Sequence, residues 1–343
     1  MKNILILGAG GSPAVNFAKS VQLDKEKRYK LIGVDINSYH KYLTEKFFDG
    51  FEIILEENKL ETINRLIEKH KIDAVHAQPD IEVRWLSDNR YKVKARTFLP
   101  PIETINTCQN KFFSQKAWAR EELLKRHPVL VSTNDYFSNL TDLFGLPFWI
   151  RHIEGAGARG AMKIEDGYQF KHWLNFWFYK KAWGNRGNPV FVAQEYFPGR
   201  DLAFQSLWYQ GQMISGQGRE RLEYIYPHLS PSGLTGTPLA AKICNDQKLT
   251  DTAINAITTI NPRPHGIYCV DLKEDKNKII RPTEINAGRF FTTSIFPAKL
   301  GKNMPLAFLD LMFDKRPSYL APTISDKYHF FRHIDCDEVL CEL

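Results

Sequence analysis

The chain has 343 residues, 43% of them hydrophobic, which is enough for two or three packed domains. Its 46 Lys and Arg residues are interleaved with 39 Asp and Glu residues, so the net charge of +7 favours an anionic small molecule over nucleic acid as the partner. We find no run of about eighteen apolar residues, and we therefore expect no membrane span.

The five cysteines are few for this length, odd in number and without a CxxC pair. This pattern argues against a disulfide framework or a structural zinc site and is typical of a reducing compartment. The apolar run at residues 4–7 reaches glycine too soon for a signal peptide and suits a first β-strand better. We expect a cytoplasmic protein.

The first hundred residues alternate between strand and helix patterns. We expect strands at 3–7, 30–35 and 72–77, and helices at 14–21 and 60–70. Strands separated by helices predict a parallel, doubly wound sheet. Ligands of such sheets lie at the carboxyl ends of the strands.

A glycine-rich segment, Gly8-Ala9-Gly10-Gly11-Ser12-Pro13, follows the first strand and precedes the first helix. This is the position of a dinucleotide-binding loop, for which Asp35 would be the ribose ligand. Pro13 holds the third glycine position, so the fingerprint is incomplete. A NAD(P)-dependent oxidoreductase is one interpretation; the other is a domain of this type with a different ligand, or none.

Two prolines, Pro100 and Pro101, indicate a domain boundary. Beyond them we expect one helix to about residue 122 that carries Asn110-Lys111. Residues 147–195 combine a strand, a glycine-rich turn, a second strand and an aromatic helix. The later elements that we expect are strands at 202–209, 266–272 and 279–284, a helix at 246–259, and a strand-like Tyr-His-Phe-Phe run in the tail.

The most informative segment is GIYCVDLKEDKNKIIRPTEINAGR, residues 266–289. Asp271 and Glu284 stand near the ends of two apolar runs joined by a polar turn. Antiparallel pairing of these runs would place the two carboxylates side by side, with Asn286 on the same face. Two carboxylates and an amide oxygen suit Mg²⁺. The alternative is a hairpin with solvent-facing acids.

Two upstream segments have features of a nucleotide site. Residues 189–201 form an apolar strand followed by a carboxylate, aromatic residues and glycine, a composition that suits adenine, with Glu195 on the ribose hydroxyls. Residues 147–151 (PFWIR) run into a glycine-rich turn at 155–162, whose backbone N–H groups could close over phosphates. Arg151 would supply a fixed positive charge there.

The order of Asn110-Lys111, PFWIR, the glycine-rich turn, QEYFPG, VDL and EINAGR resembles ATP-grasp enzymes, most of all the large-subunit type of carbamoyl-phosphate synthase and its small stand-alone relatives. The resemblance implies an α/β and α+β fold. A Rossmann-like pre-ATP-grasp domain would occupy 1–105, and a two-subdomain ATP-grasp domain 106–313, with a lid at about 130–195 and a central part at about 196–313. A tail would follow at 314–343.

The resemblance also implies ligands and roles. The residues expected to bind ATP are Lys111, Arg151, Gly155, Gly157, Gly160, Gln194, Glu195, Tyr196, Phe197 and Asp201. Asp271, Glu284 and Asn286 would hold Mg²⁺, with Mn²⁺ as the alternative ion. Arg289 would stabilise the transferred phosphoryl group, although it stands one residue later than in the large-subunit pattern, and Arg151 replaces a common Lys.

The implied activity is that of a ligase, most often one that forms carbon–nitrogen bonds. ATP phosphorylates a small carboxylate, and an amine or similar nucleophile attacks the acylphosphate with release of ADP and phosphate. We expect residues 218–221 and 226–238 to form a flexible loop, from which Arg219 acts on the acceptor carboxylate or the γ-phosphate. Oxidoreductase activity or a non-catalytic, nucleotide-binding regulatory role are the alternatives, and a homodimer is left open.

Overall fold

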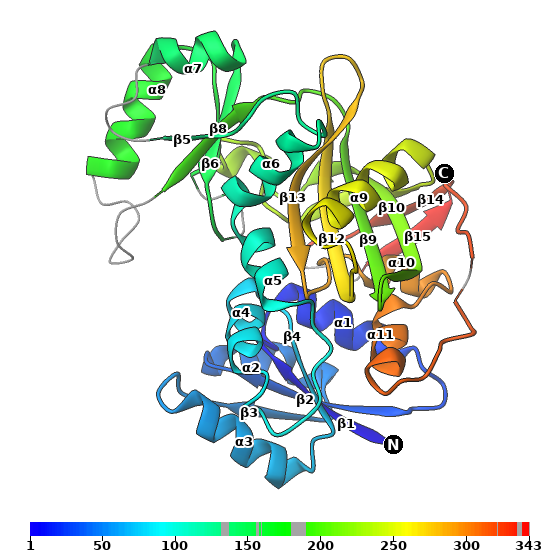
Figure 1. The fold of residues 1–343 in the computed structure, drawn as a ribbon. Coiled ribbons are helices and arrows are strands. Elements are labelled where there is room, and N and C mark those ends of the chain that lie inside the picture. Colours follow the sequence, from blue (N-terminus) through cyan, green and yellow to red (C-terminus); the bar gives the residue numbers. More distant parts are fainter. Residues whose placement is uncertain are drawn as a thin grey trace.

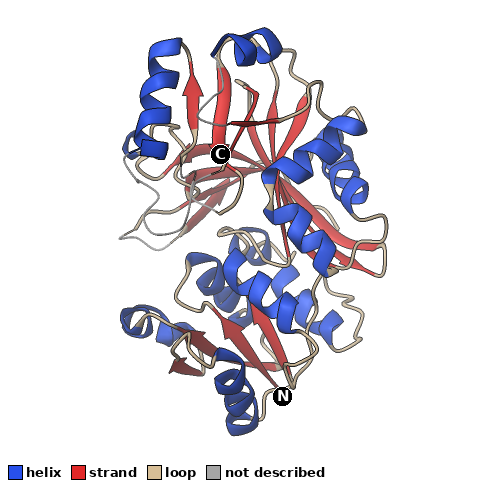
Figure 2. Ribbon diagram, turned by 60° about the vertical axis from the view of Figure 1, so that its left-hand side comes forward, coloured by secondary structure: helices blue, strands red, loops and turns tan. Residues whose placement is uncertain are grey.

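The computed structural model describes residues 1–131, 137–155, 158, 160–179, 190–320, 322–334 and 338–342. Within these residues the strands form three sheets, one of seven strands and two of four (Figure 1). Figure 2 shows the N-terminal sheet below and the other two above it. None of the helices in the described ranges is long and apolar enough to cross a membrane.

The N-terminal sheet is parallel, as the alternation of strands and helices predicts. Its strands run in the order β3-β2-β1-β4. They span Lys2–Leu7 (β1), Tyr29–Asp35 (β2), Gly50–Ile53 (β3) and Ala74–Ala77 (β4). The accompanying helices are Ser12–Gln22 (α1), Ser38–Thr44 (α2), Lys59–His70 (α3) and Asp80–Asn89 (α4).

The prediction of one helix from the proline pair to about residue 122 is wrong, because this segment forms two helices. α5 spans Ile102–Gln109 and α6 spans Lys111–Arg120. Asn110 has an extended backbone, and its side-chain oxygen accepts hydrogen bonds from the backbone N–H groups of Phe112 and Phe113. An asparagine in this position caps a new helix, and it sets Lys111 as the first residue of α6.

The small sheet is antiparallel and has the order β5-β8-β6-β7. Its strands are Val129–Val131 (β5), Phe148–His152 (β6), Met162–Ile164 (β7) and Phe191–Glu195 (β8), and its helices are Phe137–Phe144 (α7), Gly167–Leu174 (α8) and the short Asn175–Tyr179 (η2). Phe170 and Trp173 of α8 are buried in one cluster with Phe148 and Phe191. The aromatic segment thus supplies the core of this sheet.

The large central sheet has the order β13-β12-β9-β10-β11-β14-β15. Its strands are Asp201–Tyr209 (β9), Gln212–Tyr224 (β10), Pro238–Cys244 (β11), Gly266–Glu274 (β12), Ile280–Ala287 (β13), Tyr328–Phe331 (β14) and Val339–Glu342 (β15). The remaining helices are Gln247–Ile260 (α9), Ile295–Lys299 (α10) and Met304–Met312 (α11), and short turns of helix occur at Glu45–Phe47 (η1) and Pro227–Leu229 (η3).

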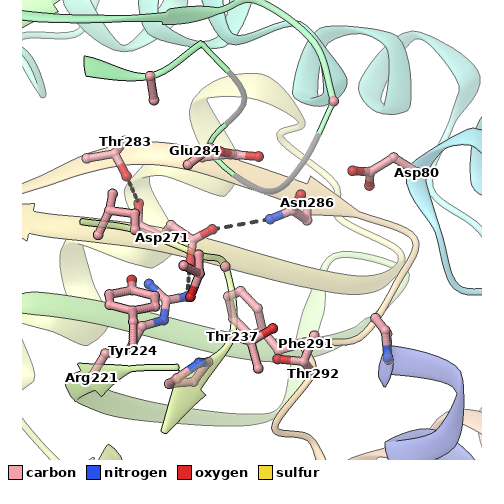
Figure 3. Close-up of a pocket in the computed structure, with 18 of the residues that line it drawn as sticks. Asp80, Arg221, Tyr224, Thr237, Asp271, Thr283, Glu284, Asn286, Phe291 and Thr292 are labelled. Carbon is pink, nitrogen blue, oxygen red and sulfur yellow. Dashed lines mark hydrogen bonds and ion pairs between the residues drawn. The ribbon is translucent and has the colours of Figure 1, made fainter. Parts of the chain in front are cut away.

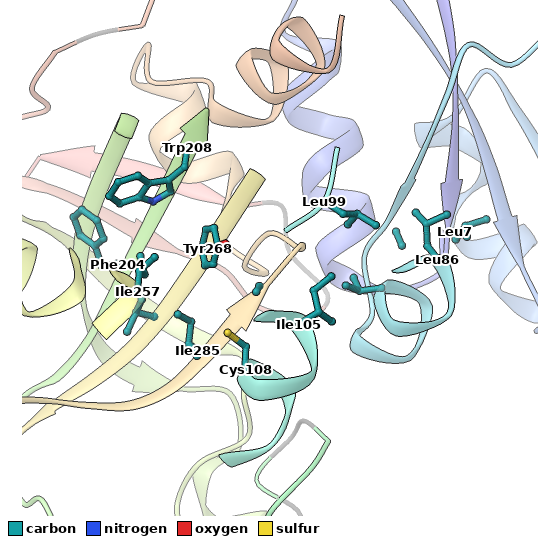
Figure 4. Packing of buried hydrophobic residues seen from close by; sticks show 14 of the residues in the cluster. Leu7, Leu86, Leu99, Ile105, Cys108, Phe204, Trp208, Ile257, Tyr268 and Ile285 are labelled. Atoms are coloured by element: carbon teal, nitrogen blue, oxygen red, sulfur yellow. The ribbon is translucent and has the colours of Figure 1, made fainter. Parts of the chain in front are cut away.

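The core joins the N-terminal sheet to the central sheet without a break. Figure 4 follows it from Leu7 and Leu86, through Ile105 of α5, to Tyr268 and Ile285. α5, α6 and α9 contact β13, so they cover one face of the central sheet. A single cluster of this kind fixes the orientation of the two sheets, because each buried side chain loses packing if they separate.

The tail, for which the sequence gives no role, completes the central sheet. β14 pairs with β11 and β15 with β14, both antiparallel. Beyond β14, Glu338 forms ion pairs with Lys19 of α1 at 2.6 Å and with Lys299 of α10 at 3.1 Å. The end of the described chain is therefore tied back to its first helix.

Candidate active site

A row of residues crosses four strands of the central sheet at the candidate site. Asp271 on β12 lies directly opposite Glu284 on β13, as the hairpin predicts. On its other side Asp271 is opposite Ala203 on β9, which is in turn opposite Arg219 on β10. Opposed residues share a face of a sheet, and the neighbours of Asp271 along β12 are buried toward α9. The row therefore points away from that helix.

Cations from outside the central sheet converge on Glu284. Lys111 Nζ lies 3.3 Å from Glu284 Oε1, and Arg151 Nη1 lies 3.2 Å from Oε2. Lys111 also donates to the carbonyl of Gly155 at 2.7 Å, and Arg151 to the carbonyl of Thr283. Burial lowers the pKa of Arg151 although Glu284 opposes this. The small sheet and α6 thus place two positive charges on one carboxylate.

Asp271 is held from the opposite side by Arg221, which also donates to Asp201 Oδ1 at 2.9 Å. The hydroxyl of Tyr224 donates to Asp201 Oδ2 at 2.8 Å. Asn286 Nδ2 donates to Asp271 Oδ2 at 3.3 Å, which confirms that Asn286 and Asp271 share a face. Asp201, expected to bind nucleotide, thus lies in the cavity with its carboxylate held by Arg221 and Tyr224.

Arg289 connects this network to the N-terminal sheet. It pairs with Asp80, the first residue of α4, through Nε and through Nη2 at 3.1 Å. Nη2 also donates to Asn286 Oδ1 at 2.6 Å. Burial alone would lower the pKa of Arg289, but the charge of Asp80 raises it above its ordinary value. Arg289 is therefore a fixed cation beside Asn286.

These side chains surround a cavity of about 490 Å³, a size typical of small-molecule sites. Its walls include Gly11, Ser12 and Pro13 at the start of α1, and Phe291 and Thr292 after β13. Figure 3 shows Asp271 and Glu284 on neighbouring strands, with Asn286 beside them and Asp80 approaching from the far side. All three sheets thus contribute to one cavity.

A smaller pocket adjoins this cavity. It brings together four residues expected around adenine, Gln194, Glu195, Tyr196 and Phe197. Trp149 and Arg151 line both hollows, as does Leu234 from the segment between β10 and β11. The ring of Tyr196 lies 6.2 Å from that of Trp149 at an interplanar angle of 31°. Aromatic walls of this kind suit a planar heterocycle.

The glycines expected to form a flap differ in their positions. Gly155 lines the cavity. Gly160 does not line it but packs against Phe191, where an added Cβ would lie 2.5 Å from the ring. Gly157 lies outside the described residues.

The expectation of a loop at residues 218–221 is wrong. Gly218–Arg221 belong to β10, paired on both sides, and the side chains of Arg219 and Arg221 are buried. The segment has few β-branched residues, which obscures the strand in the sequence. The strand pairs instead with β9 and β11, and its Arg221 contacts Asp201 and Asp271, which are 20 and 50 residues away.

Sequence reasoning missed one residue behind the cavity wall. Arg332, just after β14, donates to the carbonyl and hydroxyl of Thr292 at 2.6 and 2.9 Å and to the carbonyl of Pro238 at 3.0 Å. Burial lowers the pKa of Arg332 to about 10. Nothing near Arg332 in the sequence points to these partners, which lie 40 and 94 residues away.

No family model matches the sequence, and no curated protein matches it. Solved structures do match. An L-amino acid ligase from Bacillus licheniformis has a TM-score of 0.71 at 13% identity, over 96% of this chain and 80% of its own. N5-carboxyaminoimidazole synthetase from Staphylococcus aureus, complexed with ADP, gives 0.71 at 15%, over 96% and 82%. The biotin carboxylase domain of Hydrogenobacter thermophilus 2-oxoglutarate carboxylase, with MgADP and bicarbonate, gives 0.71 at 12%, over 96% and 73%.

This chain has the ATP-grasp fold. The resemblance in motif order is thus confirmed for the fold, at sequence identities that carry no assignment of ligand or reaction. The two carboxylates, Asn286 and the cations around them lie together in one cavity of this fold.

The donor set of this ATP-grasp cavity fits a hard divalent cation. Burial, and then the charge of Glu284, raise the pKa of Asp271, although Arg221 lowers it. A divalent cation would stabilise both carboxylates in their charged form. Among the described residues no three His, Cys, Asp or Glu side chains form a metal cluster. Two carboxylates and one amide suit Mg²⁺, which draws further oxygens from phosphate and water.

In the glycine-rich loop, the expected ribose-binding residue Asp35 is already occupied by other groups of the chain. Asp35 Oδ2 accepts the backbone N–H of Gly10 at 2.8 Å. Asp35 Oδ1 accepts that of Asn37 at 2.9 Å and lies 3.0 Å from His40 Nδ1. The imidazole of His40 fills the space beside Gly10, where an added Cβ would lie 2.1 Å from Nδ1. These contacts disfavour a dinucleotide at this loop.

Proposed function

We propose that this chain is an ATP-dependent, ADP-forming ligase that activates a carboxylate as an acylphosphate for attack by an amine or similar nucleophile. The observation that carries the proposal is the direct opposition of Asp271 and Glu284, with Lys111 and Arg151 on Glu284. Proteins of similar fold include an L-amino acid ligase, an N5-carboxyaminoimidazole synthetase complexed with ADP and a biotin carboxylase domain complexed with MgADP. The closed glycine-rich loop disfavours the oxidoreductase alternative.

Asp271, Glu284 and Asn286 are the proposed ligands of Mg²⁺, with Mn²⁺ as the alternative ion. When bound, the cation neutralises charge on the phosphates. Lys111 and Arg151 bind phosphate oxygens, which replace Glu284 as their partner. Arg289, fixed by Asp80, stabilises the charge of the transferred phosphoryl group. The oxygen set and the fixed cations support these roles.

The adenine lies in the smaller pocket in this proposal. Its proposed contacts are Gln194, Glu195, Tyr196 and Phe197, which line that pocket together. Gly155 belongs to the wall above the phosphates, and Asp201 acts through Arg221 and Tyr224, which it holds in place. Substrates are a small carboxylate and an amine, in a cytoplasmic setting that the reduced cysteines Cys108, Cys244, Cys269 and Cys341 favour.

We also propose the division expected from the sequence, with a Rossmann-like domain at 1–105, a lid at about 130–195 and a central part at about 196–313. The parallel order β3-β2-β1-β4 supports the first domain. The separate sheet of β5 to β8 supports the lid. The tail at 314–343 belongs with the central part, because β14 and β15 extend its sheet.

The proposal is tested by thermal denaturation with ATP and Mg²⁺, followed by measurement of ADP release over a panel of carboxylates and amines. We expect ATP with Mg²⁺ to raise the melting temperature and NAD to leave it unchanged. ADP release should require both substrates. Stabilisation by NAD without an effect of ATP would overturn the proposal in favour of the oxidoreductase.

A further inference from the structure

Arg219 is a buried cation without a counter-ion among the described residues. Only 4% of its surface is exposed, and its Nε has no hydrogen-bond acceptor in the described structure. The guanidinium carbon lies 4.1 Å from the centre of the Phe291 ring. Burial, and then the like charge of Arg221, lower the pKa of Arg219 to about 9. A buried charge in this condition is unfavourable unless a ligand supplies the opposite charge.

The other cations of the cavity are matched. Each of the remaining Lys and Arg residues in its described lining lies within 4.0 Å of a carboxylate; they are Lys111, Arg151, Arg221, Lys273 and Arg289. Arg219 therefore differs from the other cations of the described lining, because no carboxylate of the described residues lies within 4.0 Å of it. Among the described cations of the lining, Arg219 is the one left over for a ligand.

Arg219 also stands apart from the proposed phosphate site. Ala203 separates it from Asp271 in the row across the sheet, so the two residues are two strand spacings apart, about 9.6 Å between backbones. The side chain between them is the buried methyl group of Ala203. A group bound by Arg219 can therefore belong to the same molecule as a group that reacts near the metal ligands.

The surroundings of Arg219 favour a carboxylate over a phosphate. Its guanidinium lies over the Phe291 ring, a contact that uses none of its N–H donors and leaves them for a carboxylate. Arg332, a partly buried arginine nearby, has its donors occupied by Thr292 and Pro238. A single available cation matches one negative charge.

We propose that Arg219 binds a carboxylate that does not react, so that the amine substrate is of the amino-acid class. Arg219 and Phe291 are the binding residues, opposite the wall made by Gly11, Ser12 and Pro13. This inference rests on the proposed ligase function for the identity of the reacting groups. It separates the site of the anchored carboxylate from the site of phosphoryl transfer.

The first experiment measures ADP release with matched amines. The probes are amino acids, their carboxamides and the corresponding aminophosphonic acids, with glycine, β-alanine and γ-aminobutyrate as a series of increasing length. We expect the free acids to support ADP release and the carboxamides to fail. Arg219→Gln should raise KM for the free acids about tenfold to 100-fold and leave KM for ATP within about twofold. Arg219→Lys should lie between.

Equal use of acids and carboxamides, or an Arg219→Gln variant with unchanged KM, would overturn the inference and leave the ligase proposal intact. A preference for aminophosphonic acids would also overturn it, in favour of a phosphate-bearing amine. If ATP with Mg²⁺ did not raise the melting temperature of the wild-type protein, the ligase proposal itself would be overturned.

A second experiment needs no turnover. Arg219→Met removes a charge that lacks a partner and should raise the melting temperature of the ligand-free protein by about 2 to 4 °C. The matched control, Arg221→Met, removes a paired charge and should lower it. Glycine should protect the wild-type protein on heating but not Arg219→Met. If Arg219→Met destabilises the protein as much as the control does, Arg219 is structural and the inference fails.

Discussion

Two regions of this molecule have the sequence of a nucleotide site, but only one of them places its carboxylates in an open cavity. The glycine-rich loop after β1 is closed by its own protein, because His40 and two backbone N–H groups occupy Asp35. The cavity over the central sheet is open, and its charges come from strands far apart in the sequence. The comparison teaches that a motif marks a backbone shape, while a site needs polar groups left available to a ligand.

The largest expected effect comes from exchanging one carboxylate in each region. Glu284→Gln should reduce ADP formation by about 1000-fold, equivalent to ~4 kcal/mol of transition-state stabilisation. Asp35→Asn should leave ADP formation within about twofold but lower the free energy of unfolding by ~1–2 kcal/mol, because two backbone donors lose a charged acceptor. Steady-state kinetics and urea denaturation separate the two results. An inactive, fully folded Asp35→Asn would contradict the comparison.

A smaller effect tests how tightly the glycine-rich loop is closed. Gly10→Ala places a methyl group against the imidazole of His40 and should destabilise the protein by ~1–3 kcal/mol. Gly11→Ala is the matched control, since its Cβ would come no closer than 3.6 Å to a neighbour and should change stability by less than ~0.5 kcal/mol. Urea denaturation measures both. Equal stability of the two variants would mean that the loop or His40 shifts to accommodate the added methyl group.

The smallest effect concerns His76, which supports the junction of the two regions. Its ring lies among Phe17, Phe290 and Phe308, and burial lowers its pKa to about 3. The folded state therefore disfavours the protonated ring, so stability is complete above pH 6.5 and is lost as the pH falls toward 3. From pH 6.5 to 5.5 the wild type should lose ~1 kcal/mol more than His76→Phe. An equal loss of unfolding free energy in the two proteins between pH 6.5 and pH 5.5 would contradict this.

The parts of the fold predicted from sequence are those with local causes. Asp271 and Glu284 could be placed side by side because one short turn joins their strands. The parallel sheet followed from the alternation of strands and helices. Asn110 divided an expected helix because a capping side chain acts within three residues, a signal present in the sequence but given too little weight.

The parts that were missed have distant causes. β10 lacks a strand-like composition, and Arg221 meets its partners Asp201 and Asp271 only in the folded chain. Arg332 and Thr292 are also far apart in the sequence and meet only in the folded chain. A buried arginine cannot be recognised from a single sequence, since its partners are set by the tertiary structure. Sequence reasoning therefore named Arg219 as a candidate but placed it in the wrong kind of element.

The contact of Arg332 with Thr292 and Pro238 has a consequence for the order in which the cavity is completed during synthesis. A nascent chain that has emerged as far as residue 300 already contains every carboxylate and cation proposed to handle the nucleotide. It lacks the arginine that fixes the wall on the acceptor side. The acceptor side of the cavity is therefore complete only when Arg332 has been added, because Arg332 donates to Thr292 and Pro238.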